Sequence, residues 1–505
     1  MTPAHRATAT PRMPRRLVAL IAALVLGIGL DAPAYAVAPT EPTAVRPVTA
    51  ALPVATPTAL ITPLTIRPMT YQAEADFLLN RARTRFRVRS TLTITAPSEG
   101  MDALTIAVAA RAFGAWSDRA LRVDGIEVPF TYDAPGGMAL RLDLTAAPWE
   151  GGSVHEVIVE GVIIPGRSRN TQGLLRRFGS GRSLVITMGD MLPLPMERPR
   201  SVVFADPLSA PAAESIRATI RSASDLPAAG VIAGGELIDG PTSGVGRSWT
   251  YLIAPARSFS FLIAPGYGRN SATLELPDVD GALRTMTITA HGPTRAGRRA
   301  DLATATAAVR ALWSRFGPGP YFRLAVVSIP SVNFAHEFPG LVTVGGTFTG
   351  AWRRHVVRHE VAHQWWQTMV ATDQGRDPWM DETIAEWTAQ RLAGATRATQ
   401  RTTCARPIDG PSYRATGYYR TLFGAGQFFD CVYLRGPRLF YAVGDVVGDA
   451  RLEACLATYA QANRFGSPAP AVLIGALRGC AETDSERAAV EAAIATYLTP
   501  ATLAE

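Results

Sequence analysis

Two histidines and a glutamate fall within five positions of the segment RHEVAHQWW, residues 358–366, in a chain with only 7 histidines among 505 residues. In a helix, positions i and i+4 lie on one face, so His359 and His363 can present two imidazole nitrogens to one metal ion. Glu360 then projects to the side, within reach of a water molecule on that ion. The alternative is a solvated helix face with incidental histidines. The spacing favours a zinc site.

A catalytic zinc ion needs a third protein ligand and an open fourth position. The segment MDETIAEW places Glu382 nineteen positions after His363. The turn-forming stretch DQGRDP lies between the two segments and can fold the second helix back against the first. Glu386 lies one turn beyond Glu382, and we expect it to accept the remaining N–H of a ligand histidine. His355 shares the helix face of His359, and we expect it to have a structural role outside the metal coordination.

The motif residues must be held by a scaffold, and the N-terminal half of the chain predicts one made of strands. Over residues 70–270, short runs such as TRFRVRSTLTITAP and VHEVIVEGVII alternate in polarity and end at Gly, Asp or Pro. This period of two predicts antiparallel strands with one buried face. We therefore expect an N-terminal antiparallel β domain. An independent sugar-binding sandwich is compatible with the same strands.

Past residue 270, strands and helices are mixed. The stretch ADLATATAAVRALWSRFG predicts an amphipathic helix ended by Gly317, and FRLAVVSIP predicts a buried strand. Further helices are expected from about Ala351 to Val370, and from Asp381 as N-cap to Gly394. The remainder is mainly helical, so the predicted fold class is multidomain α+β. The predicted parts are a β domain at 70–270, a mixed unit with the zinc site at 271–395, and a helical part at 396–505.

The N-terminus has the pattern of a secretory signal peptide. RMPRR supplies positive charge, LVALIAALVLGIGL is an apolar run of 14 residues, and DAPAYA supplies small residues for cleavage after Ala36. The apolar run is shorter than the roughly 20 residues of a membrane-spanning helix, which makes a retained N-terminal anchor the less favoured alternative. We expect residues 1–36 to be removed, residues 37–69 to form a Pro/Thr/Ala-rich linker, and the mature chain to be secreted without a membrane span.

Charge and cysteine content narrow the function further. The formal net charge of +8 lies partly in the leader and is otherwise diffuse, which argues against nucleic-acid binding. All four cysteines lie in the last quarter of the chain without C-x-x-C spacing: Cys404, Cys431, Cys455 and Cys480. Two disulfides are expected in an oxidising compartment. Three connectivities are open, and pairing of sequence neighbours costs the least loop entropy.

The segments HEVAHQWW and MDETIAEW resemble the signature of the zinc aminopeptidases of the aminopeptidase N type, which are gluzincins with a thermolysin-like catalytic core. That signature is H-E-x-x-H, eighteen intervening residues and E, and the Gln-Trp and Ala-Glu-Trp that follow the ligands are also present. The resemblance implies that His359, His363 and Glu382 hold one Zn²⁺ ion, with Glu360 as general base. It also implies a saddle-like β domain beside a thermolysin-like domain at 271–395, in a short form of the family.

The segment FAHEFPGLVTV resembles the family's Gly-x-Met-Glu-Asn strand, in which the glutamate binds the free α-amine of the substrate. Glu337 aligns with that glutamate, whereas Phe334, His336 and Phe338 replace the Gly, Met and Asn. The resemblance implies that Glu337 binds the substrate amine. The replacements leave open an altered amine pocket.

The segment VYLRGPRLFYAVGDVVGD resembles a downstream Tyr-x-Lys-Gly element of the family, with Arg435 in place of the lysine. The resemblance implies that the hydroxyl of Tyr433 stabilises the oxyanion. Tyr418, Tyr419 and Tyr441 are the rival tyrosines.

These features together predict a secreted zinc metallopeptidase that acts on peptides or proteins as an aminopeptidase. Glu360 would be the general base, Tyr433 the oxyanion stabiliser and Glu337 the amine-binding residue. Two alternatives remain open: a secreted zinc endopeptidase with an altered amine pocket, and a catalytically silent zinc-containing binding protein. The sequence sets neither the oligomeric state nor the side-chain preference.

Overall fold

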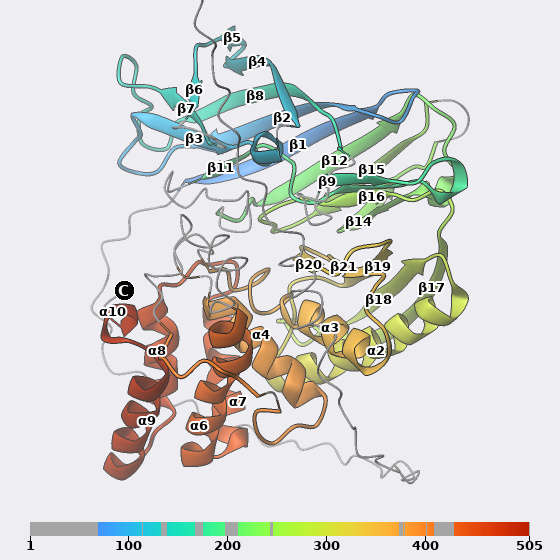
Figure 1. Cartoon of the computed structure of the whole chain (residues 1–505). Helices are drawn as coiled ribbons and strands as arrows, with labels where there is room; N and C mark the ends of the chain where they lie inside the picture. The colour runs from blue at the N-terminus through green and yellow to red at the C-terminus, as the bar shows by residue number, and fades with distance from the viewer. Residues whose placement is uncertain are drawn as a thin grey trace, which may run out of the picture. The chain divides into compact units, whose positions relative to one another are not determined.

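The structure is a computed structural model, and it describes residues 69–113, 115–132, 139–166, 175–196, 211–242, 246–372, 377, 379–399, 401–408 and 429–503 (Figure 1). All described residues belong to one compact unit. The expected leader and, apart from Met69, the expected linker lie outside the described residues. So do the rival tyrosines Tyr418 and Tyr419.

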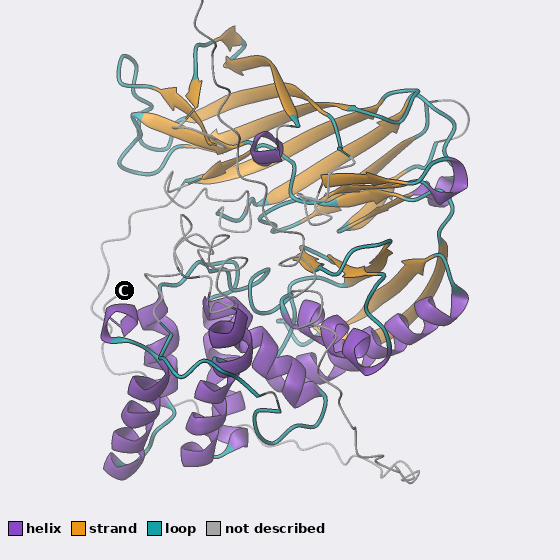
Figure 2. Cartoon of the chain, viewed as in Figure 1, coloured by secondary structure: helices purple, strands orange, loops and turns teal. Residues whose placement is uncertain are grey.

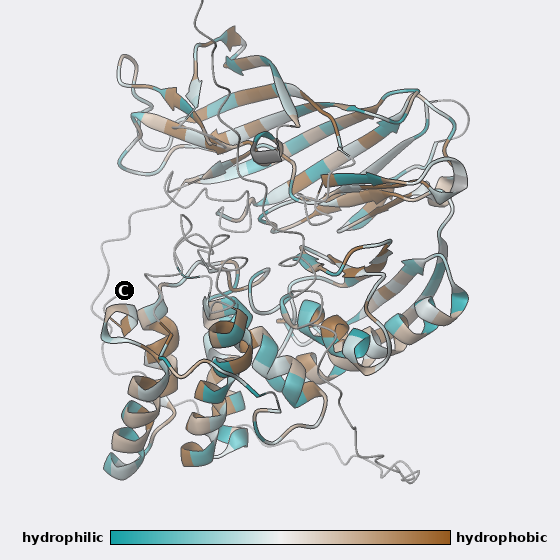
Figure 3. Ribbon diagram, viewed as in Figure 1, coloured by the Kyte–Doolittle hydropathy of each residue, from teal (hydrophilic) through white to brown (hydrophobic). Residues whose placement is uncertain are grey.

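The N-terminal part is built on an eight-stranded sheet in the order β14-β15-β12-β1-β2-β8-β4-β5. Its strands are β1 Thr70–Leu79, β2 Phe86–Thr95, β4 Trp116–Val123, β5 Ile126–Glu127, β8 Val154–Ile163, β12 Ser215–Ser222, β14 Glu236–Asp239 and β15 Ser248–Ile253. Neighbours pair antiparallel except β1 and β12, which run parallel. Residues along β1 and β2 alternate between buried and exposed, and Figure 3 shows the matching bands of hydropathy. This alternation confirms that the period of two marks one buried face.

Two four-stranded sheets complete the β part. One has the order β13-β16-β10-β9 and comprises β9 Leu175–Phe178, β10 Val185–Met188, β13 Val231–Ala233 and β16 Phe261–Ile263. The other has the order β11-β3-β7-β6 and comprises β3 Ala103–Ala107, β6 Thr131–Tyr132, β7 Ala139–Asp143 and β11 Leu194–Met196. Apolar side chains of the first sheet share a core with the catalytic sheet, where Leu262 and Ile232 meet Phe338 and Leu341.

The catalytic part begins with a five-stranded mixed sheet in the order β17-β18-β19-β21-β20. Its strands are β17 Gly268–Pro277, β18 Leu283–Gly292, β19 Arg323–Ile329, β20 Ala335–Phe338 and β21 Leu341–Gly345. Strands β18, β19 and β21 run parallel, and β20 lies at the edge, antiparallel to β21. Helix α2, Arg295–Phe316, starts at an N-cap Thr294 whose side chain accepts from the Gly297 N–H, and ends before Gly317, as expected.

Helices, joined by turns and loops, dominate the rest of the described chain, as Figure 2 shows in purple and teal. They are α3 Gly350–Ala362, α4 Trp379–Leu392, a π-helical turn at Phe429–Arg435, α6 Pro437–Val447, α7 Asp449–Ala462, α8 Pro470–Gly479, α9 Asp484–Tyr497 and α10 Pro500–Leu503. Within the described part of the chain, no helix has both the length and the apolar character needed to cross a bilayer. The multidomain α+β fold class is confirmed.

Two expected helix limits were wrong. Helix α3 ends at Ala362 instead of near Val370, and turns follow in which Trp365 and Trp366 are both buried. In these turns the backbone N–H groups of Thr368, Met369 and Val370 donate to carbonyl groups five positions earlier instead of four, so the regular α-helix does not continue. Asp381 lies inside the first turn of α4 instead of at its N-cap, because the helix already begins at Trp379.

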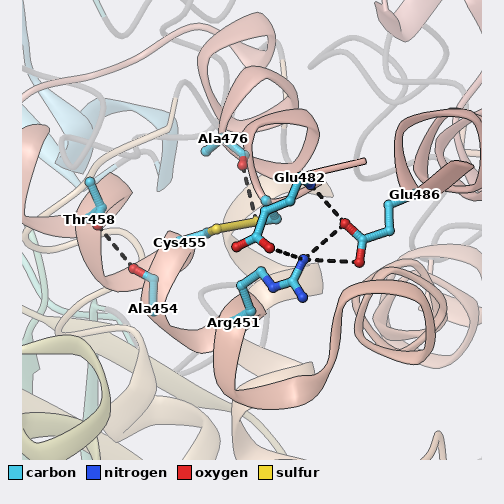
Figure 4. The surroundings of a disulfide bond; sticks show 8 residues. Arg451, Ala454, Cys455, Thr458, Ala476, Glu482 and Glu486 are labelled. Carbon is cyan, nitrogen blue, oxygen red and sulfur yellow. Dashed lines mark hydrogen bonds and ion pairs between the residues drawn. A yellow bond between two sulfur atoms is a disulfide. The ribbon is translucent and has the colours of Figure 1, made fainter. Parts of the chain in front are cut away.

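Two disulfides join sequence neighbours, which is the pairing that loop entropy favours. Cys404 pairs with Cys431, and Cys455 pairs with Cys480, at Cα separations of 5.2 and 5.9 Å. The second links α7 to the end of α8 (Figure 4).

Arg451 of α7 reinforces this link from the side (Figure 4). Its guanidinium lies 3.5 Å from the Glu482 carboxylate and 2.9 Å from that of Glu486. Glu486 also accepts hydrogen bonds from the backbone N–H groups of Glu482 and Thr483 at the start of α9. Together these contacts hold α7, α8 and α9 as one bundle.

Candidate active site

Helix α3 positions the three residues of the H-E-x-x-H segment. His359 and His363 face the same side of the helix, and their rings meet edge to face with centroids 4.7 Å apart. His359, Glu360 and His363 are all buried. Buried ionisable groups are stable only when they are paired or bind a metal, so this face of α3 is not an ordinary solvated surface.

Glu382 of α4 completes a triangle with the two histidines. Its Oε2 atom lies 3.1 Å from His359 Nε2 and 3.3 Å from His363 Nε2, and the two Nε2 atoms are 3.0 Å apart. A tetrahedral zinc ion with bonds of about 2.0–2.1 Å holds its ligand atoms roughly 3.3–3.4 Å apart. The three side chains therefore have the separation that one zinc ion requires.

The outer ring nitrogens show that both Nε2 atoms are free to act as ligands. His363 Nδ1 donates a hydrogen bond to the carbonyl oxygen of Trp366 over 2.9 Å. His359 Nδ1 lies 3.2 Å from Glu386 Oε2, a close charge contact that is not a straight hydrogen bond. With the N–H on Nδ1 in each neutral ring, two nitrogen lone pairs and a carboxylate oxygen converge. These three electron-rich atoms repel one another unless a cation lies between them.

Glu386 occupies the position expected of a carboxylate behind the metal ligands. Besides its contact with His359, its Oε2 atom lies 2.9 Å from His355 Nε2, and its Oε1 accepts from the Gln390 side chain at 3.0 Å. Burial raises the pKa of Glu386, but the neighbouring His355 and His359 outweigh it and bring the pKa to about 2. His355 thus lies outside the triad and contacts it through Glu386.

Burial raises the pKa of both Glu360 and Glu382, but the neighbouring histidines outweigh it only at Glu382. Burial raises the pKa of the Glu360 carboxyl to about 8, with the histidines opposing the shift. Glu360 Oε2 has no hydrogen-bond partner among the described residues, so it is available to a water molecule. Burial also raises the pKa of Glu382, but the charges of His363 and His359 outweigh it and hold this pKa well below its usual range.

Tyr433 lies beside the triad, on the π-helical turn at Phe429–Arg435. Its ring stacks on that of His359 with centroids 5.8 Å apart, and the Cys404–Cys431 disulfide anchors the same turn. The rival Tyr441 is buried in α6 near Trp387, and its hydroxyl has no hydrogen-bond partner among the described residues. Of the two candidate tyrosines that lie among the described residues, Tyr433 is the one next to His359.

Glu337, on the edge strand β20, lies beside His363. Donor atoms of Glu337, His363 and Asp381 all lie within 4.8 Å of one another. Burial raises the pKa of Glu337, with the charge of His363 opposing the shift. The structure thus brings Glu337 next to the triad, although Phe338 and His336 replace the residues that flank such a glutamate in the family that the sequence resembles.

Asp190, which sequence reasoning missed, lies in the β part of the chain, close enough to Glu337 for the charge of Glu337 to act on it. It is buried in a left-handed backbone conformation with φ 51°, and the Ser260 hydroxyl donates to its Oδ1 over 2.9 Å. Burial raises the pKa of Asp190 to about 7, and the charge of Glu337 adds to the shift. The available signal was a carboxylate inside the apolar run VITMGDMLPLPM.

Comparisons with known proteins agree with this geometry. The model of the peptidase family M1 domain matches residues 350–494, which include both zinc-site helices. Comparison with curated proteins finds no match. Among solved structures, the chain is similar to the M1 zinc metallopeptidase of Deinococcus radiodurans, with 16% identity and a TM-score of 0.61 over 85% of this chain and 94% of that chain.

A variant of that enzyme, solved with a bound Tyr-Ser-Ala substrate, is similar at 16% identity and a TM-score of 0.60, over 86% of this chain and 96% of that one. At this identity the likeness supports the shared fold. The sequence match over both zinc-site helices shows a peptidase family M1 domain at residues 350–494, and with it a zinc metallopeptidase that uses one catalytic Zn²⁺ ion.

Proposed function

We propose that the protein is an aminopeptidase, which removes residues one at a time from the free N-terminus of peptides. The observation that carries this proposal is the Glu337 carboxylate, which lies beside the triad of His359, His363 and Glu382 and acts through its charge on Asp190; we call these two carboxylates the acidic pocket. Two neighbouring carboxylates, one half-buried and one buried, favour a cation, and a substrate ammonium group supplies one. Fixing the ammonium there places the first peptide bond at the triad.

The triad residues and their neighbours would divide the work of hydrolysis. A zinc ion held by His359, His363 and Glu382 supplies Lewis-acid activation of a water molecule and of the substrate carbonyl. Glu360 accepts the proton of the attacking water and returns it to the departing amine. The Tyr433 hydroxyl donates a hydrogen bond to the carbonyl oxygen as that atom becomes negatively charged.

The edge position of β20 supports a peptide as substrate. One side of this strand pairs with β21, and β20 is the last strand of the sheet. An extended peptide can bind beside an edge strand as an additional strand. Because Glu337 lies on the same strand, backbone pairing and amine binding would act on one substrate together.

The test compares substrates that differ only at the amine. Amino-acid arylamides and short peptides with a free N-terminus should be hydrolysed, and their N-acetylated forms should not. Equal hydrolysis of both forms would favour the endopeptidase alternative. If the zinc-loaded protein hydrolyses neither form in a broad peptide library, the silent binding protein is the better description.

We also infer that the protein acts outside the cytoplasm. The pattern of residues 1–36 favours export, and the two disulfides, Cys404–Cys431 and Cys455–Cys480, are typical of oxidising compartments. N-terminal sequencing of the mature protein should begin at Val37. A first residue of Met1 in the purified secreted form would contradict cleavage after Ala36.

A further inference from the structure

A large aromatic side chain lies exposed on the same face of α3 as the metal ligands. Trp352 is 45% exposed, whereas most tryptophans of the described chain are buried. It precedes His359 by seven positions and His363 by eleven. At about 100° per residue, these spacings turn Trp352 to within about 20° of each histidine around the helix axis. The indole therefore lies on the side of the helix where the reaction takes place.

The surroundings of Trp352 hold the indole but leave much of it uncovered. Its ring stacks on His355 with centroids 5.2 Å apart and an interplanar angle of 11°, and Phe348 meets it edge-on at 6.4 Å. His355 is itself held by Glu386 over 2.9 Å. A tryptophan supported in this way offers a rigid apolar surface at little cost in side-chain entropy.

The acidic pocket of Glu337 and Asp190 determines the direction in which a bound peptide would extend from the triad. Glu337 lies beside His363, the ligand at the C-terminal end of α3. A peptide with its ammonium group at Glu337 and its first carbonyl at the triad then continues past His359, toward the N-terminal end of the helix. Trp352 lies at that end.

The distance sets which substrate residue reaches the indole. Seven residues at about 1.5 Å each place Trp352 roughly 10 Å beyond His359 along the helix. An extended peptide advances about 3.3 Å per residue, so this separation corresponds to about three residues.

We propose that Trp352 is a specificity-determining residue, which binds an apolar or aromatic side chain at the second or third position after the cleaved bond. The inference rests on the proposed aminopeptidase function and adds a substrate class to it. The preferred substrates are peptides of at least three or four residues with such a side chain, in preference to single amino-acid amides.

The experiment measures kcat/KM for four substrates: Leu-arylamide, Leu-Gly-Gly-Gly, Leu-Gly-Phe-Gly and Leu-Gly-Gly-Phe. The wild-type protein should hydrolyse at least one Phe-containing peptide about tenfold better than Leu-Gly-Gly-Gly. Trp352→Ala should remove that preference and leave Leu-arylamide hydrolysis unchanged, while Trp352→Phe should keep most of the preference. Val472→Ala on α8, where the side chain is 43% exposed, is the matched control and should change nothing.

Two outcomes would overturn the inference alone. One is an unchanged preference in Trp352→Ala. The other is an equal loss on Leu-arylamide and on the Phe peptides, because this would show an effect transmitted through His355 and Glu386 to the metal centre. If the wild-type protein hydrolyses none of the four substrates, the proposed function itself fails and this inference falls with it.

Discussion

The triad of His359, His363 and Glu382 and the acidic pocket beside it both contain carboxylates withdrawn from solvent, yet the neighbouring groups shift the pKa values of these carboxylates in opposite directions. Glu382 contacts two imidazoles, and their charges outweigh burial and hold its pKa well below the usual range. Asp190 contacts mainly serine hydroxyls, so burial prevails and raises its pKa to about 7. Burial prevails over the charge of His363 at Glu337 as well. The charge of the nearest partners thus decides what a buried carboxylate binds.

The two regions also differ in how the chain assembles them. The triad comes from α3 and α4, adjacent helices whose ligands lie within 24 residues, from His359 to Glu382. The pocket joins Glu337 on an edge strand to Asp190 on a loop of the β part, 147 positions earlier. We infer that the triad determines the chemistry and the pocket determines which peptides reach it. The following predictions test that division.

Glu360→Gln should give the largest loss. Removing the proton acceptor should lower kcat by about 10³-fold, within the usual range for general acid–base catalysis. The zinc content should stay at one ion per chain, because Glu360 is not a ligand. Stopped assays on Leu-arylamide, together with metal analysis, would check both. A loss of less than tenfold would mean that another group takes the proton.

Tyr433→Phe should give the second largest loss of activity. Loss of one hydrogen bond to the developing oxyanion should reduce kcat by about 10²-fold with little change in KM. Tyr441→Phe is the matched control, since that hydroxyl has no hydrogen-bond partner among the described residues. If the two variants behave alike, Tyr433 does not stabilise the oxyanion.

Glu337→Gln should affect the pocket without affecting the triad. Hydrolysis of free-amine substrates should fall about 10- to 100-fold in kcat/KM, the loss expected for a hydrogen bond between charged groups. Residual activity on N-acetylated substrates should not fall. The ratio of kcat/KM for free-amine substrates to kcat/KM for N-acetylated substrates should therefore decrease. Undiminished preference for a free amine in Glu337→Gln would contradict the assigned role.

Asp190 should give a smaller effect that depends on pH. Because burial raises its pKa to about 7, the carboxyl is neutral below that pH and charged above it. Binding of free-amine substrates should therefore strengthen, by severalfold, as pH rises through about 7, and Asp190→Asn should remove this dependence. KM measured between about pH 5.5 and 8.5 would show it.

The same ionisation of Asp190 should lower the stability of the protein as pH rises, although it strengthens substrate binding. A carboxyl whose folded pKa is raised contributes stability that is complete below its unfolded pKa of about 3.9 and is lost as pH rises through the folded pKa. The free energy of unfolding of the wild-type protein should thus decrease toward pH 7 relative to that of Asp190→Asn. Parallel pH profiles for the two proteins would show that the raised pKa is wrong.

Gln364→Met should give the smallest change in catalysis. The Gln364 side chain accepts from the Gly340 N–H over 3.1 Å and donates to the Phe338 carbonyl oxygen over 3.0 Å, tying α3 to the strand that carries Glu337. Its loss should raise KM for free-amine substrates about threefold and lower the melting temperature, since two buried backbone groups lose their partner.

Gln367→Met is the matched control for that change. Gln367 is equally buried in the same segment, but its Oε1 accepts from Thr372 instead of from the strand. It should lower the melting temperature without changing KM. A similar rise in KM in both variants would show that Gln364 has no particular role in positioning Glu337.

The convergence of His359, His363 and Glu382 could be predicted from the sequence because its geometry is local. Helical periodicity places His359 and His363 on one face, and a turn signal is enough to bring Glu382 back to them. The β domain was predictable for a similar reason, since alternation of polarity records which face of a strand is buried. The resemblance to known zinc aminopeptidases added the family, which the match over residues 350–494 supports.

The pocket was less predictable because it depends on packing between distant segments. Asp190 is a functional candidate only because the loop after β10 comes to lie near β20. No spacing in the sequence records that approach. The end of α3 was missed as well, because the turns after Ala362 contain apolar residues such as Trp365 and Trp366, which fit a continued buried helix equally well.

The most direct test of the account is the zinc content of the purified protein and of two variants. If His359, His363 and Glu382 bind one ion, elemental analysis should find one zinc per chain in the wild-type protein and in Glu360→Gln. The Glu382→Ala protein, dialysed against the same buffer, should contain almost none. A full complement of zinc in Glu382→Ala would contradict the account, because the ion would then be held by other residues.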